Sequence, residues 1–327
     1  MPDIPERLIE IVGGSTAIVE IKEYLSRVAA SDCNVLITGE TGTGKELAAA
    51  YLHSHSPRHT HRLIPVNCAA IPDSLIESEL FGHESGAFTG AVGRREGMME
   101  LAARGTLFLD EIGDMSPLAQ AKVLRIIESK DLYRLGGKSS VPLDVRIVAA
   151  TNRDVEKCVE TGSFRKDLYF RLNVARIHLP PLREHKEDIP LLANRFVESL
   201  NRRYHRRIDR LGAELLTTLT RYDWPGNVRE LKNLLEAAFI AVKSDEITIR
   251  DVPLHFQRAL GLNISRMTNE RDVLICTLQS TNWNKSQAAE KLNWSRMTLY
   301  RKLAKHRIAR ATEPHRAAPD PSTGIKT

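Results

Sequence analysis

A glycine-rich loop between a short apolar run and a helical run constrains the fold of this chain of 327 residues more than any other feature. The loop reads Gly39-Glu40-Thr41-Gly42-Thr43-Gly44-Lys45, which fits the G-x-x-x-x-G-K pattern of a phosphate-binding loop. The β-branched run before it, 34–38, predicts a buried strand, and the run after it, 46–52, predicts a helix. Backbone N–H groups and the amino end of that helix attract phosphate, and the lysine reaches the outer phosphates. The loop therefore predicts an α/β nucleotide-binding domain.

Two consecutive acids, Asp110 and Glu111, follow a second apolar strand. Hydrolysis of a nucleotide triphosphate needs one carboxylate that holds Mg²⁺ and one that polarises the attacking water. Alone, such a pair is more often a solvated strand end, but after a phosphate-binding loop it indicates catalysis. Glu46 stands where a hydroxyl commonly binds the magnesium, so more of the coordination must come from Asp110. We predict an ATPase that uses ATP and Mg²⁺.

Strands alternate with helices over the first part of the chain, and the pattern then becomes wholly helical. Alternation of this kind predicts an α/β domain around a parallel sheet, and the later part predicts a smaller all-α subdomain. The expected helices are 16–29, 193–200, 213–221 and 228–242, and the further expected strands are 106–109 and 145–150. The predicted boundaries are 1–180 for the α/β core, 181–254 for a helical lid, 255–269 for a linker, 270–310 for a helix-turn-helix domain and 311–327 for a disordered tail.

The carboxyl-terminal part carries the positive charge of the chain. Residues 257–316 hold twelve Lys/Arg against four Asp/Glu, a surplus larger than the net charge of +6 of the whole chain. A helix at 286–292, a turn and a second helix at 296–306 with Ser295 as its N-cap indicate a helix-turn-helix. A basic solvated tail and a generic helical hairpin are the alternatives. Leu299 and Leu303 share one face, which leaves Arg296, Thr298, Arg301, Lys302 and Lys305 as the predicted DNA-binding residues.

Other features exclude several classes of protein. No run of eighteen apolar residues predicts a membrane span, and the first residues lack the pattern of a signal peptide, so we expect a cytoplasmic protein. The four cysteines are scattered singly, which disfavours a zinc site or a disulfide framework. A second basic cluster is interpreted as a solvated face of the lid; its members are Arg202, Arg203, Arg206, Arg207 and Arg210.

The stretch Gly86-Ala87-Phe88-Thr89-Gly90-Ala91, preceded by Glu79-Leu80-Phe81-Gly82-His83-Glu84, resembles the bacterial enhancer-binding proteins, the AAA+ activators of sigma-54 RNA polymerase. The resemblance runs from about residue 11 to 253 and again through 270–308. It implies that the hexapeptide grips sigma-54, with Phe88 and Thr89 as contact residues, and that 133–144 is a second, supporting loop. Without the resemblance, a hairpin turn with the phenylalanine in the core would be favoured. An exposed aromatic side chain at a loop tip suits docking onto a partner.

The resemblance also implies roles for residues around the nucleotide. Asn67 resembles the switch that holds the catalytic Glu111, and Thr151-Asn152 resembles the sensor of the terminal phosphate. Arg229 matches the sensor arginine of the lid. Arg165 and Arg171 match the arginine fingers that act on a neighbouring subunit, and which of them is the principal finger stays open. Fingers of this kind imply a homo-oligomer, a hexameric ring when active and a dimer when inactive.

The leading hypothesis is a transcriptional activator that binds upstream DNA and uses ATP hydrolysis to convert a closed sigma-54 promoter complex into the open complex. About ten residues precede the ATPase domain, so we expect control by a separate regulatory protein or by the expression level. An AAA+ replication initiator or helicase loader is disfavoured by the hexapeptide, and a DNA-binding regulator without motor activity is disfavoured by the intact acids. Three positions depart from the family's usual pattern, namely Arg104, Ala175 and His185.

Overall fold

The computed structural model describes residues 10–260, 274–275, 277–278, 281, 283–292, 294–306 and 308. The chain divides into two compact units, 1–256 and 257–327, and each is described by itself. None of the helices in the described residues is long and apolar enough to cross a membrane.

Five parallel strands form the central sheet of the first unit, in the order β2-β3-β6-β1-β7. Because all five run in the same direction, their carboxyl ends meet at one edge of the sheet. In register, Asn67 at the end of β2 lies beside Asp110 at the end of β3, and Thr38 of β1 lies beside Thr151 of β6. The sequence segments expected to bind nucleotide therefore leave the sheet at the same edge. The strands are β1 Val35–Thr38, β2 Leu63–Asn67, β3 Thr106–Asp110, β6 Arg146–Thr151 and β7 Ala175–His178.

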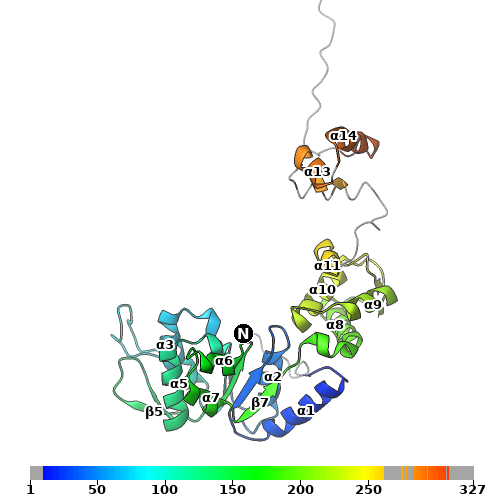
Figure 1. Ribbon diagram of the computed structural model, residues 1–327. Coiled ribbons are helices and arrows are strands. Elements are labelled where there is room, and N and C mark those ends of the chain that lie inside the picture. Colours follow the sequence, from blue (N-terminus) through cyan, green and yellow to red (C-terminus); the bar gives the residue numbers. More distant parts are fainter. Residues whose placement is uncertain are drawn as a thin grey trace, which may run out of the picture. The chain divides into compact units, whose positions relative to one another are not determined.

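Helices cover both faces of this sheet (Figure 1). Alternate residues of β3 point to opposite faces: Leu107 and Leu109 pack in one apolar core, and Phe108 packs in the other. Burial on both faces explains why the strands read as continuous apolar runs. One face is covered by α1 Thr16–Ala29 and α2 Lys45–Ser54, and the other by α3 Asp73–Phe81, α5 Pro117–Ser129 and α7 Lys166–Leu172. Shorter elements are α4 Met98–Leu101, α6 Val155–Glu160, η2 Cys68–Ala70, η3 Ile112–Asp114 and the hairpin β4 Asp131–Tyr133 with β5 Ser140–Pro142.

The middle strand β6 is tied to the end of α1 by a buried arginine. The guanidinium of Arg146, the first residue of the strand, donates to the carbonyl oxygens of Val28, Ala29 and Cys33 at 2.9, 3.3 and 3.1 Å. The last carbonyls of a helix lack partners within the helix, so this side chain completes the end of α1. All six residues of β6 are buried. The strand that ends at Thr151 is therefore fixed at its other end.

The lid follows the sheet as a separate helical layer, and its three long helices confirm the three expected from the sequence. The predicted linker 255–269 begins with helix α11, and 261–269 lie outside the described residues. The lid contains η4 Leu182–Glu184, η5 Lys186–Asp188, α8 Ile189–Tyr204, α9 Ala213–Arg221, α10 Asn227–Ala241, α11 Leu254–Ala259 and the short strands β8 Arg210–Leu211 and β9 Glu246–Ile247.

The basic cluster on α8 and the loop after it is bound within the lid. Arg206 is part-buried and donates to the carbonyl oxygens of Phe239 and Val242 at the end of α10, at 2.8 and 2.7 Å. Three other members form ion pairs, Arg203 with Glu236, Arg207 with Asp209 and Arg210 with Glu246. Four of the five arginines are thus engaged within the lid, which agrees with their interpretation as a face of the lid, whereas Arg202 lines a cavity beside α8.

The second unit contains α13 Lys285–Lys291 and α14 Arg296–Lys305. Leu299 and Leu303 of α14 are buried together with Ala288 and Ala289 of α13. The predicted N-cap is confirmed, because Ser295 Oγ accepts from the N–H of Thr298 at 3.2 Å. The two helices therefore share a small apolar core. Arg296, Arg301 and Lys305 lie exposed on α14, whereas the ammonium of Lys302 lies 4.7 Å from the centre of the Trp294 ring.

Arg104 occupies a backbone conformation that favours glycine. Its φ is +63°, where an L side chain costs about 1–2 kcal/mol. Gly105 has a different requirement, since a Cβ there would lie 2.1 Å from the carbonyl oxygen of Arg62. The departure of Arg104 from the family's glycine pair is therefore a strained position at the start of β3.

We expect Arg104→Gly to raise the free energy of unfolding by about 0.5–1 kcal/mol, the relief of the left-handed conformation less the added entropy of a glycine in the unfolded chain. Denaturant titration of the two proteins measures the difference. Gly105→Ala serves as the contrast and should lower stability. A lower stability of Arg104→Gly would mean that contacts of the arginine outweigh the backbone strain.

Candidate nucleotide-binding site

The phosphate-binding loop connects β1 to α2 and closes tightly on itself. Thr43 Oγ1 donates to the carbonyl oxygen of Glu40 at 2.8 Å. The ammonium of Lys45 is buried and donates to the carbonyl oxygens of Gly39 and Glu40 at 3.0 and 3.3 Å. Gly42 has a φ of +83°, and a Cβ on it would lie 2.3 Å from the carbonyl oxygen of Gly226. Only glycine fits there, because the loop passes directly against the lid.

The two acids at the end of β3 lie beside this lysine. Glu111 Oε1 is 3.6 Å from Lys45 Nζ. Burial, and then the neighbouring Glu111, raise the pKa of Asp110, while Lys45 opposes the rise. A buried carboxylate next to another gains from a cation, so Asp110 fits a divalent ion. Mg²⁺ commonly takes one or two carboxylates and the phosphates of the substrate, so a single carboxylate beside the phosphate-binding loop is enough to hold it.

Asn152 connects the loop to the second acid. Its side-chain Nδ2 donates to Thr41 Oγ1 at 3.1 Å, and its backbone N–H donates to Glu111 Oε2 at 3.0 Å. Thr151 is fully buried, and its hydroxyl oxygen accepts from the N–H of Arg153. Of the predicted sensor pair, Asn152 contacts the site and Thr151 supports the turn.

Asn67 caps its own turn in this structure. Its Oδ1 accepts from the N–H groups of Ala69 and Ala70 at 3.0 and 3.1 Å. Glu111 is held instead by Lys45 and Asn152. Asn67 nevertheless lies at the same cavity as the acids.

A cavity of about 360 Å³ gathers most of the predicted nucleotide residues. Gly39, Glu40 and Thr43 do not line it, and neither do Thr151 and Asn152. Arg229 of α10 lines it from the lid, and its backbone N–H donates to the carbonyl oxygen of Gly42 at 3.3 Å. The predicted residues that line the cavity are Thr41, Gly42, Gly44, Lys45, Glu46, Asn67, Asp110, Glu111 and Arg229.

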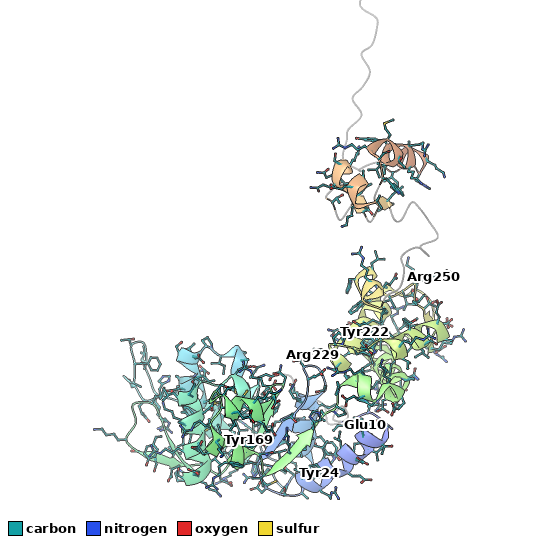
Figure 2. The ribbon with its side chains drawn as sticks, viewed as in Figure 1. Glu10, Tyr24, Tyr169, Tyr222, Arg229 and Arg250 are labelled. Carbon is teal, nitrogen blue, oxygen red and sulfur yellow. The ribbon has the colours of Figure 1, made fainter. Side chains whose placement is uncertain are left out.

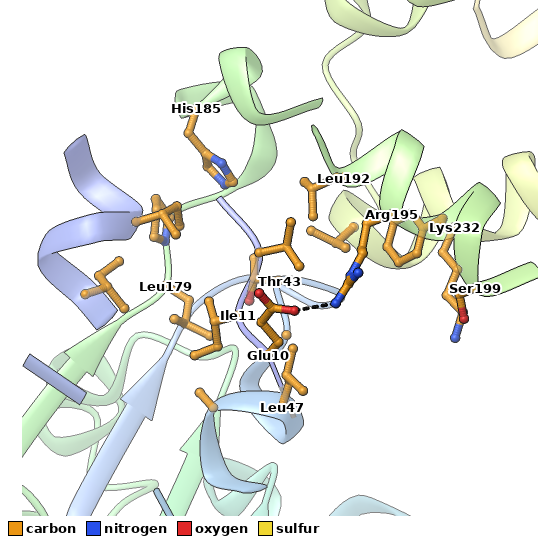
Figure 3. Close-up of a pocket in the computed structure, with 18 of the residues that line it drawn as sticks. Glu10, Ile11, Thr43, Leu47, Leu179, His185, Leu192, Arg195, Ser199 and Lys232 are labelled. Atoms are coloured by element: carbon orange, nitrogen blue, oxygen red, sulfur yellow. Dashed lines mark hydrogen bonds and ion pairs between the residues drawn. The ribbon is translucent and has the colours of Figure 1, made fainter. Parts of the chain in front are cut away.

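A second, largely apolar cavity of about 380 Å³ adjoins the first (Figure 3). The sequence interpretation did not identify it. Its walls come from separate parts of the sequence: the residues before and at the start of α1, the phosphate-binding loop with α2, the segment between β7 and α8, and the lid helices α8 and α10. Glu10 and Arg195 pair across it at 2.6 Å, from opposite sides. The two cavities share Gly44, Leu47, Val228 and Lys232, and further apolar lining comes from Ile11, Val12, Ile18, Leu179, Leu192 and Phe196.

A buried polar group fixes one wall of the apolar cavity. Asp188 accepts from the N–H of Gly14 and Ser15 at 2.6 and 2.9 Å, from Ser15 Oγ at 2.6 Å and from His185 Nδ1 at 3.1 Å. Burial alone would raise the pKa of Asp188, but these hydrogen bonds lower it below its usual value. The carboxylate therefore stays ionised and joins the segment before α1 to the start of the lid. His185, one of the departures from the family's pattern, lines the cavity as part of this group.

The two candidate finger arginines lie on the surface at α7. Arg165, just before the helix, pairs with Asp167 at 2.7 Å, and Arg171 pairs with Glu128 at 3.0 Å. Their side chains are 45% and 58% exposed, and neither lines the nucleotide cavities of its own chain. Exposed Phe170 lies between them in sequence. This surface is open to a second molecule.

The hexapeptide 86–91 forms a compact double turn. The N–H of Gly86 donates to the carbonyl oxygen of Ala91 at 2.9 Å, and the N–H of Ala91 donates to that of Phe88 at 3.0 Å. The ring of Phe88 is 43% exposed and packs edge-on against His83, with 5.0 Å between ring centres. His83 in turn hydrogen-bonds Ser78 of α3. The aromatic side chain is thus partly exposed and rests on the base of its loop.

The hairpin of β4 and β5 supports this base. The N–H of Glu84 donates to the carbonyl oxygen of Leu135 at 3.0 Å. The guanidinium of Arg134 pairs with Glu84 at 2.8 Å and with Glu100 at 2.5 Å. The two loops are therefore joined by backbone and by charge. These loops lie apart from α7, where the finger arginines are found; Tyr169 of that helix is labelled in Figure 2.

Three family models match the chain in succession. They describe a sigma-54 interaction domain at residues 11–178, an AAA+ ATPase lid domain at 183–262 and a bacterial regulatory protein of the Fis family at 265–306. The chain is similar to the transcriptional regulatory protein ZraR of Salmonella typhimurium, with 42% identity over 93% of this chain and 70% of that protein. It is also similar to the formate hydrogenlyase transcriptional activator FhlA of Escherichia coli, with 45% identity over 90% of this chain and 44% of that protein. Among solved structures it is similar to NtrX from Brucella abortus in complex with ATP, with a TM-score of 0.72 and 30% identity over 91% of this chain and 70% of that chain.

Proposed function

The chain belongs to the sigma-54 activators, AAA+ ATPases that carry a Fis-type helix-turn-helix, and on this premise we propose how its residues do the work. Its activity is transcriptional activation at sigma-54 promoters, driven by ATP hydrolysis. One observation carries the assignment of residues: Lys45, both acids and Arg229 line a cavity that adjoins an apolar one. The pair of cavities has the two environments that a nucleotide needs, one for phosphate and one for a base.

ATP lies with its base in the apolar cavity and its phosphates at the loop. Lys45 exchanges its present carbonyl partners for phosphate oxygens. Asp110 would hold Mg²⁺, which would neutralise phosphate charge. Glu111 polarises the attacking water while Lys45 and Asn152 hold its carboxylate, and Asn67 lies at the same cavity as the switch. Thr41, Gly42, Gly44 and Glu46 complete the contact with the phosphates.

The finger arginines act on a second copy of the chain. Each is exposed and held by a single surface carboxylate, a weak pairing that a phosphate can replace. An arginine placed against the transferred phosphate stabilises the charge of the transition state. Arg165 and Arg171 therefore imply a closed ring, a hexamer, formed from dimers when the protein is activated. Either arginine can be the principal finger.

The hexapeptide transmits the motion to sigma-54. Phe88 leaves His83 and docks on the partner, with Thr89 beside it, while the hairpin of β4 and β5 supports the loop. Gly86, Ala87, Gly90 and Ala91 leave the contact uncrowded. RNA polymerase is reached through sigma-54.

The second unit holds upstream activating DNA. Helix α14 enters a major groove, where basic side chains neutralise phosphates. The residues are Arg296, Thr298, Arg301, Lys302 and Lys305. These partners place the protein in the cytoplasm, and a separate regulatory protein controls it.

Open-complex formation in a purified system tests this function. Sigma-54 polymerase, a promoter with upstream sites and the full chain should yield open complexes with ATP and none with a non-hydrolysable analogue. Equal yield with both nucleotides would sink the coupling of hydrolysis to remodelling. A replication initiator or helicase loader would give no open complexes with either nucleotide.

A further inference from the structure

We propose that Glu40 is the anchor of the lid on the phosphate loop: it positions Arg229 and does not bind phosphate. The inference rests on the nucleotide site proposed above and assigns one of its loop residues a different task. Glu40 lies at the second position of the glycine-rich motif, yet it does not line the phosphate cavity.

The carboxylate of Glu40 is occupied by two residues of the lid. Arg183 of η4 binds it with both arms of the guanidinium, NH2 to Oε1 at 2.5 Å and NH1 to Oε2 at 2.8 Å. Asn227, the first residue of α10, donates from Nδ2 to Oε2 at 3.2 Å. Arg183 and Asn227 belong to different elements of the lid. The carboxylate of Glu40 therefore binds the lid at two places: at η4, where the lid begins, and at α10, the helix that carries Arg229.

The side chain of Asn227 is fixed in place because both its amide nitrogen and its amide oxygen are hydrogen-bonded. The residue is fully buried. Besides Glu40, its Nδ2 donates to the carbonyl oxygen of Thr41 at 3.0 Å, and its Oδ1 accepts from the N–H of Leu182 at 2.8 Å. Its φ of +51° is a left-handed conformation that asparagine tolerates better than most residues. The start of α10 is thus bound to the loop through a fixed side chain.

The backbone of the phosphate-binding loop also contacts the backbone of the lid, at Gly42. Gly42 lies so close to Gly226 that no Cβ fits between them, and the N–H of Arg229 donates to the carbonyl oxygen of Gly42. Arg229 is the second residue after Asn227, in the first turn of α10, and lines the phosphate cavity. The orientation of its side chain therefore depends on the side chain of Asn227, which Glu40 holds.

The charge of Glu40 fits this task. Its hydrogen bonds from Arg183, and then from Asn227, lower its pKa to about 2, so the carboxylate is ionised at any working pH. A free carboxylate in the loop would repel a triphosphate, and Arg183 neutralises it. The two side chains are 43% and 41% exposed, so their ion pair adds little to folding stability, and its removal leaves a folded protein.

The test compares the full chain with Glu40→Gln, which keeps the size of the side chain and removes its charge. Affinities for ADP and for a non-hydrolysable ATP analogue are measured, together with kcat and KM for ATP. We expect the affinity for the ATP analogue to fall about fivefold, the effect of one good ion pair. ADP affinity should change less, because we assign Arg229 to the terminal phosphate, which ADP lacks. Arg183→Gln should weaken binding of the ATP analogue at least as much, because it also leaves the Glu40 carboxylate without its cation beside the phosphates.

Two controls make the result specific. Glu246→Gln removes the ion pair with Arg210 elsewhere in the lid and should leave both affinities unchanged. The double variant Glu40→Gln/Arg183→Gln should be no weaker than either single variant, because the two residues act through one contact.

Three outcomes would overturn the anchor: unchanged affinities, equal losses for ADP and the ATP analogue, or additive losses in the double variant. Equal losses of affinity for the two nucleotides would mean that Glu40 supports the conformation of the phosphate-binding loop and does not act through Arg229. Failure of the proposed nucleotide site is a separate result, since the unsubstituted chain would then bind neither nucleotide.

Discussion

Replacing Glu111 by Gln should leave ATP binding intact and slow hydrolysis by about 100-fold or more, the contribution of a positioned general base. Glu111 is held by Lys45 at 3.6 Å and by the N–H of Asn152 at 3.0 Å, so the amide fits the same place. The affinity for ATP should not fall, because the substitution removes a negative charge beside the phosphates. Single-turnover hydrolysis and an independent binding titration measure the two effects.

Asp114→Asn is the matched control for this experiment. Asp114 is an acid of the neighbouring turn η3 that pairs with Arg153 and does not line the phosphate cavity. Its substitution should change neither binding nor turnover. Hydrolysis by Glu111→Gln at the rate of the unsubstituted protein would remove Glu111 from the role of base and leave Asp110 to be tested.

Phe88→Ala should keep ATP hydrolysis and abolish activation. The ring lies on the hexapeptide loop and packs only partly against His83, so its loss leaves the nucleotide cavities unchanged. A docked aromatic side chain is worth about 2 kcal/mol or more in a protein interface, a roughly 30-fold loss of affinity for sigma-54. Parallel assays of ATPase rate and open-complex yield separate the two activities.

Val92→Ala tests whether the effect belongs to Phe88 or to any apolar side chain of this loop. Val92 is 94% exposed and follows the hexapeptide directly. We expect it to activate like the unsubstituted chain. Full activation by Phe88→Ala would contradict the assignment of the loop, and loss of ATPase in that variant would instead place the residue in the folding of the domain.

The helices, strands and caps that are specified by residues adjacent in sequence were predictable. The strand, loop and helix around Lys45 form as expected, because each is specified by local periodicity and by the glycines between them. The same holds for the acids after β3 and for the N-cap Ser295 of α14. Two of the five residues of β2 and two of the four residues of β7 are exposed, so these strands lack the continuous buried apolar run that revealed β1.

The apolar cavity could not be predicted from local pattern. It exists only where the segment at the start of α1, the phosphate-binding loop with α2, the segment after β7 and two lid helices meet, and no sequence window contains all of them. A signal was present in the apolar pair Ile11-Val12 before Gly13, which has no place in a solvated terminus. The sequence also did not distinguish the roles of different residues within one motif. Only the geometry separates Asn152, which contacts the loop, from the buried Thr151, and shows Glu40 directed to the lid.

Strand β6 is held firmly in the sheet, and it positions Asn152 beside the proposed nucleotide site. It is clamped by Arg146 to the end of α1, flanked by β3 and β1, and it delivers Asn152 at its other end. Local opening is rare in such a deeply buried element, so thermal fluctuation displaces Asn152 little. Arg229 arrives on a helix of a different layer. With Arg229 and Asn152 in the roles that the family resemblance implies, the chemical state of the nucleotide would be registered as movement of Arg229 relative to a stationary Asn152, which is held in place through Arg146 at the other end of the strand.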